Sequence, residues 1–198
     1  MQFSDTCSFR MISTESYNNL PTVSEADSSS EGLNPVKQRL LDIVTRHGLA
    51  DKFGVRLIHK HFDMNEGEIP VFRDIDVPGI CTAIFMGPVR DNSLGPVFGK
   101  NFLLDSESAI VPFEYTTSPC EAPSGYPGFV EEFAHELLVS NAAKVLGLCT
   151  YPKRSESYTE YELPALRCAI PSRVWPVSYA TCFRSQEHYY DTQATRAS

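Results

Sequence analysis

The order of hydrophobic periods along the chain constrains its fold more than any other feature of the sequence. A helical period runs through about 35–47 and again through about 129–146, whereas a period of two, typical of strands, begins at Gly54. Further strand-like segments lie at 68–72, 80–86, 109–116, 158–163, 166–170 and 175–183. Because helices and strands do not alternate regularly, we expect an α+β fold. It would have a mainly antiparallel β-sheet or open barrel of about six to seven strands, with two principal helices packed on it.

The first helical segment is marked at both ends. Asn34 is a favoured N-cap, Pro35 is a favoured first helical residue, and Gly48 follows the last turn. The apolar stripe between them consists of Val36, Leu40, Ile43, Val44 and His47. In the second segment the stripe consists of Phe129, Val130, Phe133, Leu137, Leu138 and Val145, and Gly147 is expected to end that helix.

The N-terminal segment has a different composition from the rest of the chain. Residues 1–34 are rich in Ser, Thr, Asn and acidic side chains, and their apolar residues show no period. Such a segment buries too little apolar surface to offset the entropy cost of ordering. We therefore expect a disordered acidic tail over 1–34, a single α+β domain over 35–184 and a frayed C-terminal tail over 185–198.

The charge distribution narrows the classes of partner. The formal net charge is −8, and Lys and Arg gather in no basic stripe, which disfavours binding to nucleic acid or to an anionic membrane. The six cysteines form no C-x-x-C pair and are expected to be reduced. No apolar run suits a secretory signal or a membrane span. We expect a cytoplasmic protein with a small-molecule substrate, and a homodimer stays open.

The pair His59-Lys60-His61 is the strongest candidate for chemistry. On a strand, residues i and i+2 project from one face with Cα atoms about 7 Å apart, so both imidazoles could converge on one substrate or metal ion. Val55, Leu57 and Asp63 would share that face. The competing interpretation is a pair of strand histidines whose hydrogen bonds are satisfied at the edge of the core.

Glu114 is the second candidate because it lies within the apolar segment 110–115. It shares a face with Ile110 and Pro112, and a buried carboxylate needs a partner or a raised pKa, both of which occur in active sites. The alternative is an edge strand whose glutamate reaches water.

Three hypotheses follow for function. The first is a cofactor-independent enzyme of the isomerase, lyase or cyclase type, acting on a small, fairly apolar metabolite. In it His59 and His61 would be base and acid, with Glu114 orienting one of them. The second is a divalent-metal enzyme with His59, His61 and a carboxylate, Glu66 or Glu68, as ligands. The third is a non-catalytic binding module whose acidic tail engages a partner.

Motifs for other chemistries are absent from the sequence. There is no P-loop, dinucleotide fingerprint or G-x-S-x-G elbow, which disfavours ATP-driven, nicotinamide and serine-hydrolase chemistry. Glu132 and His135 form an E-x-x-H step on the second helix, a spacing found in carboxylate-bridged metal sites. Both lie away from the apolar stripe of that helix, so we expect them to face solvent.

Two resemblances accompany these patterns. The pattern H-G-L…F-G-x-x-L-x-H-x-H-F…E over 47–66 resembles one found in small uncharacterised fungal proteins, which implies a fungal cytosolic protein of specialised metabolism and carries no activity over. The stretch from Gly54 through His59 and His61 to Glu66 resembles the first cupin motif in part, which implies metal binding. Its glycine is one residue too close to the first histidine, and Gly128 stands where the last cupin histidine is expected.

Overall fold

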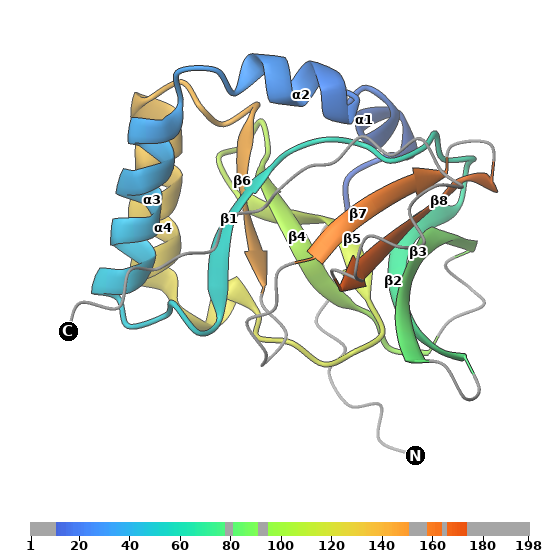
Figure 1. The fold of residues 1–198 in the computed structure, drawn as a ribbon. Helices are drawn as coiled ribbons and strands as arrows, with labels where there is room; N and C mark the ends of the chain where they lie inside the picture. Colours follow the sequence, from blue (N-terminus) through green and yellow to red (C-terminus); the bar gives the residue numbers. More distant parts are fainter. Residues whose placement is uncertain (1–10, 78–80, 91–94, 151–157, 164–165, 174–198) are drawn as a thin grey trace.

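The computed structural model describes residues 11–77, 81–90, 95–150, 158–163 and 166–173 (Figure 1). The expected tail over 185–198 and the expected strand over 175–183 lie outside these residues. The helices are α1 (Thr14–Asn18), α2 (Val23–Ser29), α3 (Asn34–Arg46), the 3-10 turn η2 (Pro123–Gly125) and α4 (Pro127–Val139). The strands are β1 (Phe53–Leu57), β2 (Glu68–Val77), β3 (Cys81–Arg90), β4 (Phe98–Leu104), β5 (Ile110–Thr116), β6 (Leu146–Thr150), β7 (Tyr158–Leu163) and β8 (Cys168–Arg173).

Within the described residues, the strands form one sheet in the order β1-β6-β4-β5-β2-β3-β8-β7. Neighbouring strands pair antiparallel, apart from β2 and β5, which pair in parallel. The sheet curls, and β7 and β8 pass in front of β4 and β5 in the view of Figure 1. The predicted α+β class is confirmed, although the sheet is mixed.

Helices α3 and α4 cover one face of the sheet at its β1–β6–β4 end. Val55, Leu148 and Phe102 point toward them and join the main core, as do other alternate residues of these strands. Arg39 of α3 donates to Glu136 of α4 at 2.8 Å, at the exposed edge of the contact. The side chains on the opposite face of the same strands point away from these helices and form a separate environment.

The ends of the two long helices test the sequence predictions. Gly48 follows α3 at φ 68°, as predicted. The predicted N-cap is wrong by one residue, because Asn34 is the first helical residue and Leu33 precedes it without a side-chain cap hydrogen bond. Helix α4 was predicted to continue to about 146 and ends instead at Val139, so this prediction is wrong. The chain leaves α4 through Asn141 at φ 55°, and Leu146 begins β6, a strand in the middle of the sheet.

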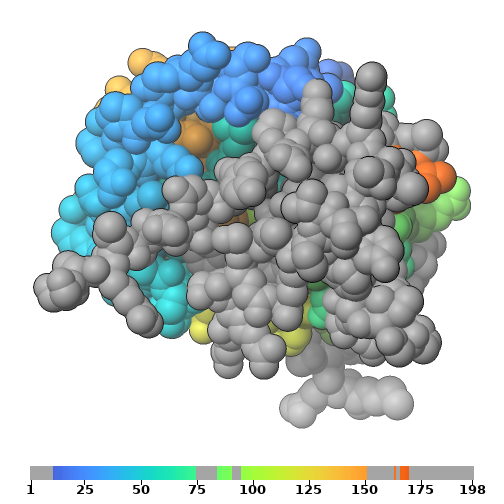
Figure 2. All heavy atoms as spheres, viewed as in Figure 1, coloured from blue at the N-terminus to red at the C-terminus, as the bar shows by residue number. Residues whose placement is uncertain are grey.

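The prediction of a disordered segment over 1–34 does not hold for the part of it that the structure describes. Residues 14–18 and 23–29 form α1 and α2, with α2 at the molecular surface in Figure 2. Ser13 caps α1, and Thr22 with Glu25 forms a capping box on α2. Tyr17 is 2% exposed within a second core cluster. Side-chain helix caps and burial against the domain thus order a segment that its composition alone predicts to be disordered.

The segment that carries the histidine pair also differs from prediction. Strand β1 ends at Leu57, so His59 and His61 do not lie on an extended strand. The segment is held against the N-terminal helices instead, because the Lys60 backbone N–H donates to Pro21 O at 2.8 Å and Lys60 Nζ donates to Asn18 O at 2.6 Å. The pairing there is a single parallel bridge between Thr22 and Lys60.

Among the described residues, no helix combines the length and apolarity that crossing a bilayer requires.

Candidate active site

The site is built on the face of the sheet opposite α3 and α4. Gly54 of β1 pairs with Cys149 of β6, which pairs with Asn101 of β4, which pairs with Glu114 of β5. Because directly paired residues project to the same side of a sheet, this row defines one face, and Arg56 lies on it two residues beyond Gly54.

A bulge in β4 modifies this row at its centre. Gly99 pairs with Tyr115 and Asn101 pairs with Glu114, so two steps on β4 match one step on β5 and Lys100 is the extra residue. Bulges re-aim side chains, and here the bulge places Lys100 directly beside the Asn101–Glu114 pair.

Glu114 is the centre of the cluster and is 0% exposed. Its Oε1 lies 3.3 Å from His61 Nε2 and its Oε2 lies 3.8 Å from Arg56 Nη2. Asn101 Nδ2 donates a hydrogen bond to Oε2. Burial alone would raise the pKa of Glu114, but the charge of Arg56 and the contact with His61 outweigh it and lower that pKa to about 2. The carboxylate is therefore ionised at neutral pH.

His59 is 1% exposed and has a defined tautomer. Its Nδ1 lies 3.0 Å from Leu57 O, and because a carbonyl only accepts, Nδ1 carries the proton. Burial, followed by the neighbouring His61 and Arg56, lowers the pKa of His59 well below 6.5. The ring is therefore neutral, and its buried Nε2 keeps a lone pair without any hydrogen-bond partner in the described protein.

His61 occupies a position with two opposed partners. Its Nε2 lies 3.2 Å from Arg56 Nη2, a permanent donor, and 3.3 Å from Glu114 Oε1, a permanent acceptor. The nitrogen can therefore donate to Glu114 when protonated or accept from Arg56 when unprotonated. Its ring lies edge-on to that of His59, with centroids 4.6 Å apart. Each protonation state at Nε2 thus has a partner without movement of the ring.

The structure brings together the three residues predicted for acid–base chemistry, His59, His61 and Glu114. The face of the sheet differs from the predicted one. The histidines lie on the side of Arg56 and not on the side of Val55 and Leu57. The roles of Arg56, Lys100 and Asn101 were not predicted, and no local pattern in the sequence identifies them.

The predicted metal-ligand set is not assembled. Glu66 is exposed in the turn before β2, whereas both histidines are buried. The part of the chain that the structure describes holds no group of three or more His, Cys, Asp or Glu residues that could bind a metal ion. Glu68 is engaged elsewhere by Arg167, whose hydrogen bond lowers the pKa of Glu68 to about 2.

The remaining histidines on helices lie away from the site. His47 Nε2 contacts Glu132 Oε2 at 2.8 Å across the α3–α4 surface. Arg46 forms an ion pair with the same carboxylate, so Glu132 of the E-x-x-H step joins the two helices. His135 is exposed, as expected.

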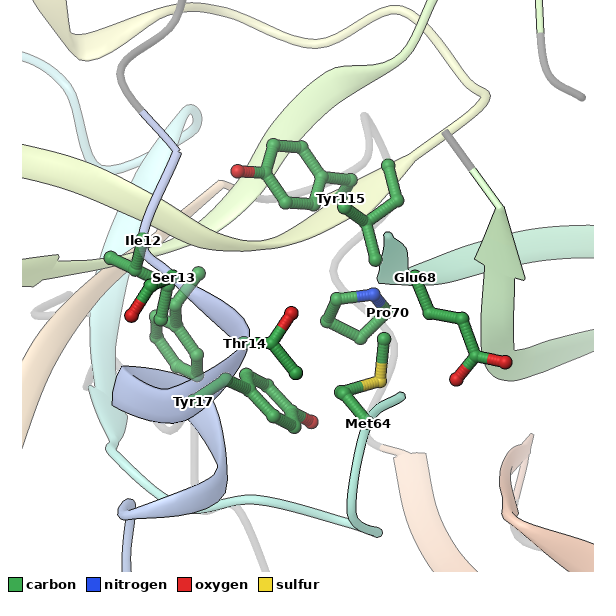
Figure 3. A pocket seen from close by; sticks show the side chains of 10 residues that line it. Ile12, Ser13, Thr14, Tyr17, Met64, Glu68, Pro70 and Tyr115 are labelled. Carbon is green, nitrogen blue, oxygen red and sulfur yellow. The ribbon is translucent and has the colours of Figure 1, made fainter. Parts of the chain in front are cut away.

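A small pocket lies on another part of the molecule, between the N-terminal residues and the start of β2 (Figure 3). Ile12 and Tyr17 line it on one side, and Met64 and Pro70 line it on the other. The volume between them is about 240 Å³, part of which is open solvent. Neither His59 nor His61 lines this pocket. This pocket is therefore not the shared hollow expected beside the two imidazoles.

Comparisons of the chain with protein-family models, with curated proteins and with solved structures gave no match.

Proposed function

We propose that this protein is an enzyme of the isomerase, lyase or cyclase type that moves a proton within a small, fairly apolar substrate. The observation that carries this proposal is the buried neutral His59, whose Nε2 has no described partner, lying against a second imidazole that contacts an ionised carboxylate. Two titratable groups in such opposite environments are the arrangement expected of a base and an acid.

In this proposal His59 is the base. Its Nε2 takes a proton from the substrate, while the electrons of the broken bond stay in the substrate. The Nδ1–H donated to Leu57 O keeps the lone pair on Nε2 throughout. A low pKa makes an imidazole a weak base in water. In a site that excludes water, however, the attraction between its lone pair and an acidic substrate proton is stronger.

His61 supplies a proton to the other end of the reacting system. The carboxylate of Glu114 stabilises the cationic form of His61, and Arg56 donates to the ring once the proton has left. The starting state returns when the proton on His59 passes to His61, either between the adjacent rings or through solvent. Glu114 acts as a positioning residue and stays ionised.

The proposal is tested by solvent deuterium exchange. The purified protein is incubated in D₂O with a panel of small, mainly apolar ketones, enones and 2-oxo acids, and deuterium entering each compound at carbon is measured by mass spectrometry. We expect catalysed exchange for at least one compound, reduced about a hundredfold or more by His59→Ala and by His61→Ala, since general acid–base groups contribute at least this much.

His135→Ala is the matched control, because His135 is exposed on α4 and belongs to no part of the site. It should exchange at the wild-type rate. Exchange that is absent from the wild type across the panel, or that survives in His59→Ala, contradicts the proposal.

A further inference from the structure

The segment between β1 and β2, residues 58–67, carries both histidines of the site but is not a strand. Among the described residues, one parallel bridge, between Thr22 and Lys60, pairs it with another part of the chain. Neighbouring strands fix the side chains of a sheet through the hydrogen bonds of their backbones. The imidazoles of His59 and His61 therefore keep their places only if other contacts hold this segment.

Asn18, the last residue of α1, makes a paired contact with the segment. Its Nδ2 donates to Met64 O at 2.9 Å, and its Oδ1 accepts from the Met64 N–H at 2.7 Å. One amide side chain thus satisfies both backbone groups of Met64, as a paired residue of an antiparallel strand would. An asparagine can do this because its short side chain carries both a donor and an acceptor.

The chain around Asn18 also holds the segment on the other side of His61. The backbone O of Asn18 accepts from Lys60 Nζ at 2.6 Å, and Pro21 O accepts from the Lys60 N–H at 2.8 Å. His61 therefore lies between two residues, Lys60 and Met64, that are both bonded to the N-terminal part of the chain.

The packing of the segment separates its apolar side chains from its histidines. Ile58, Phe62 and Met64 belong to the same core cluster as Tyr17 of α1, whereas His61 contacts Glu114. A backbone that shifted along α1 would therefore change the apolar packing and the position of the imidazoles together.

We propose that Asn18 is a positioning residue of the acid–base site, because its pairing with Met64 and its bond to Lys60 hold the backbone that places His59 and His61. This inference rests on the acid–base function proposed above and adds to that site a residue from the N-terminal part of the chain. Asn18 acts through the backbone of residues 58–64 and takes no part in the proton transfers.

The test compares Asn18→Ala with Asn19→Ala. Asn18→Ala removes both hydrogen bonds to Met64 and keeps the backbone O that Lys60 contacts. Asn19 is the matched control, because it is exposed and caps α1 through its backbone N–H, which alanine retains. For each variant, ¹⁵N–¹H spectra of histidine-labelled protein are recorded between pH 5 and 8, at a temperature where urea denaturation shows the variant to be folded.

In Asn18→Ala we expect His59 to lose its single Nδ1–H tautomer and its pKa to rise toward 6.5. The reason is that burial, the main cause of the lowered pKa, depends on a fixed backbone. The titratable and charged groups around the ring, His61, Arg56 and Glu114, are the same in both variants. Asn19→Ala should give the wild-type spectrum.

The rate of deuterium exchange into substrate should fall about tenfold or more in Asn18→Ala and stay at the wild-type value in Asn19→Ala. A misplacement of about 1 Å can lower a rate about a hundredfold. If Asn18 only stabilised the fold, Asn18→Ala would melt lower and keep the wild-type His59 spectrum. That result, or the same spectral change in Asn19→Ala, overturns the inference.

Hydrogen exchange of the wild-type amides decides the question if Asn18→Ala does not fold. The N–H groups of Lys60 and Met64 donate to Pro21 O and Asn18 Oδ1, so we expect both to exchange about a hundredfold or more slowly than in an unfolded chain. Exchange of either N–H at the rate of an unfolded chain would show that the segment is not held, and the inference would be wrong.

The two proposals fail separately. A wild-type His59 spectrum in folded Asn18→Ala removes the role of Asn18 and leaves the acid–base proposal intact. A changed spectrum in Asn18→Ala, together with no deuterium exchange by the wild type, retains Asn18 as the residue that positions the histidine segment and removes the acid–base chemistry.

Discussion

Glu114 determines the electrostatics of the whole cluster. The side chain is inaccessible to solvent, yet it is ionised because Arg56, His61 and Asn101 surround it. A buried charge of this kind is tolerated only when nearby groups compensate it, and removing one member leaves the others uncompensated. Oε2 accepts a hydrogen bond from Asn101, whereas Oε1 lies 3.3 Å from His61 Nε2 without a hydrogen bond among the described residues. The same arrangement that permits the carboxylate therefore makes the cluster intolerant of substitution.

Glu114→Gln tests this at the scale of one residue. At pH 7 we expect it to lower the free energy of unfolding by about 3 kcal/mol, because Arg56 loses its buried counter-charge. The folded-state pKa of Glu114 is about 2, below its usual 4.5, so the carboxylate stabilises the native state fully above pH 4.5. That contribution is lost as pH falls from 4.5 toward 2, and the gap between wild type and variant should close over this range. Urea denaturation at a series of pH values measures the gap.

Glu131→Gln, on the exposed surface of α4, is the control and should change the free energy of unfolding by less than about 0.5 kcal/mol at pH 7. A gap for Glu114→Gln that stays constant down to pH 2, or that is as small as the control value, would mean that Glu114 is not an ionised, buried residue.

At the scale of elements, the sequence predicts those helices and strands whose positions depend on the local hydrophobic period and on capping residues. Helix α3 begins within one residue of its predicted start because Pro35 and the apolar stripe agree, although Leu33 and not Asn34 is the N-cap residue. Helix α4 was predicted too long, because the apolar residues after Val139 keep a helical spacing while belonging to the sheet core. The period alone cannot distinguish a buried strand from a buried helix segment.

Elements fixed by distant contacts could not be predicted in the same way. The strand expected through His61 ends at Leu57, because Lys60 bonds to Pro21 and Asn18 in the segment expected to be disordered. The proximity of His59, His61 and Glu114 was predicted from residue type, whereas the bulge that adds Lys100 depends on the register of β4 against β5.

Tyr17→Ala tests the packing of the N-terminal helices. Tyr17 is 2% exposed in the cluster that contains Ile58, Phe62 and Met64, so we expect the free energy of unfolding to fall by about 3 kcal/mol or more. Glu15→Gln, on the exposed side of the same helix, should have an effect below about 0.5 kcal/mol. Equal effects of the two substitutions in denaturant unfolding would show that α1 does not pack on the domain in solution.

At the scale of the whole molecule, one sheet serves two purposes on its two faces. The face of β1, β6 and β4 toward α3 and α4 is apolar and forms the main core. The other face carries a polar row from Cys149 through Asn101 to Glu114, flanked by Arg56 and Lys100. These residues come from four strands, β1, β4, β5 and β6, which is why the site emerges from the strand order rather than from a motif.

The measurement that tests the account most directly is the tautomeric state of His59, observed in ¹⁵N–¹H correlation spectra of histidine-labelled protein between pH 5 and 8. His59→Gln identifies the signals. We predict a neutral ring with its proton on Nδ1 and an unprotonated Nε2 across the whole range, because burial, His61 and Arg56 lower its pKa well below 6.5. A proton on Nε2 at any pH in this range, or titration of His59 near pH 6.5 like an exposed histidine, would contradict the account.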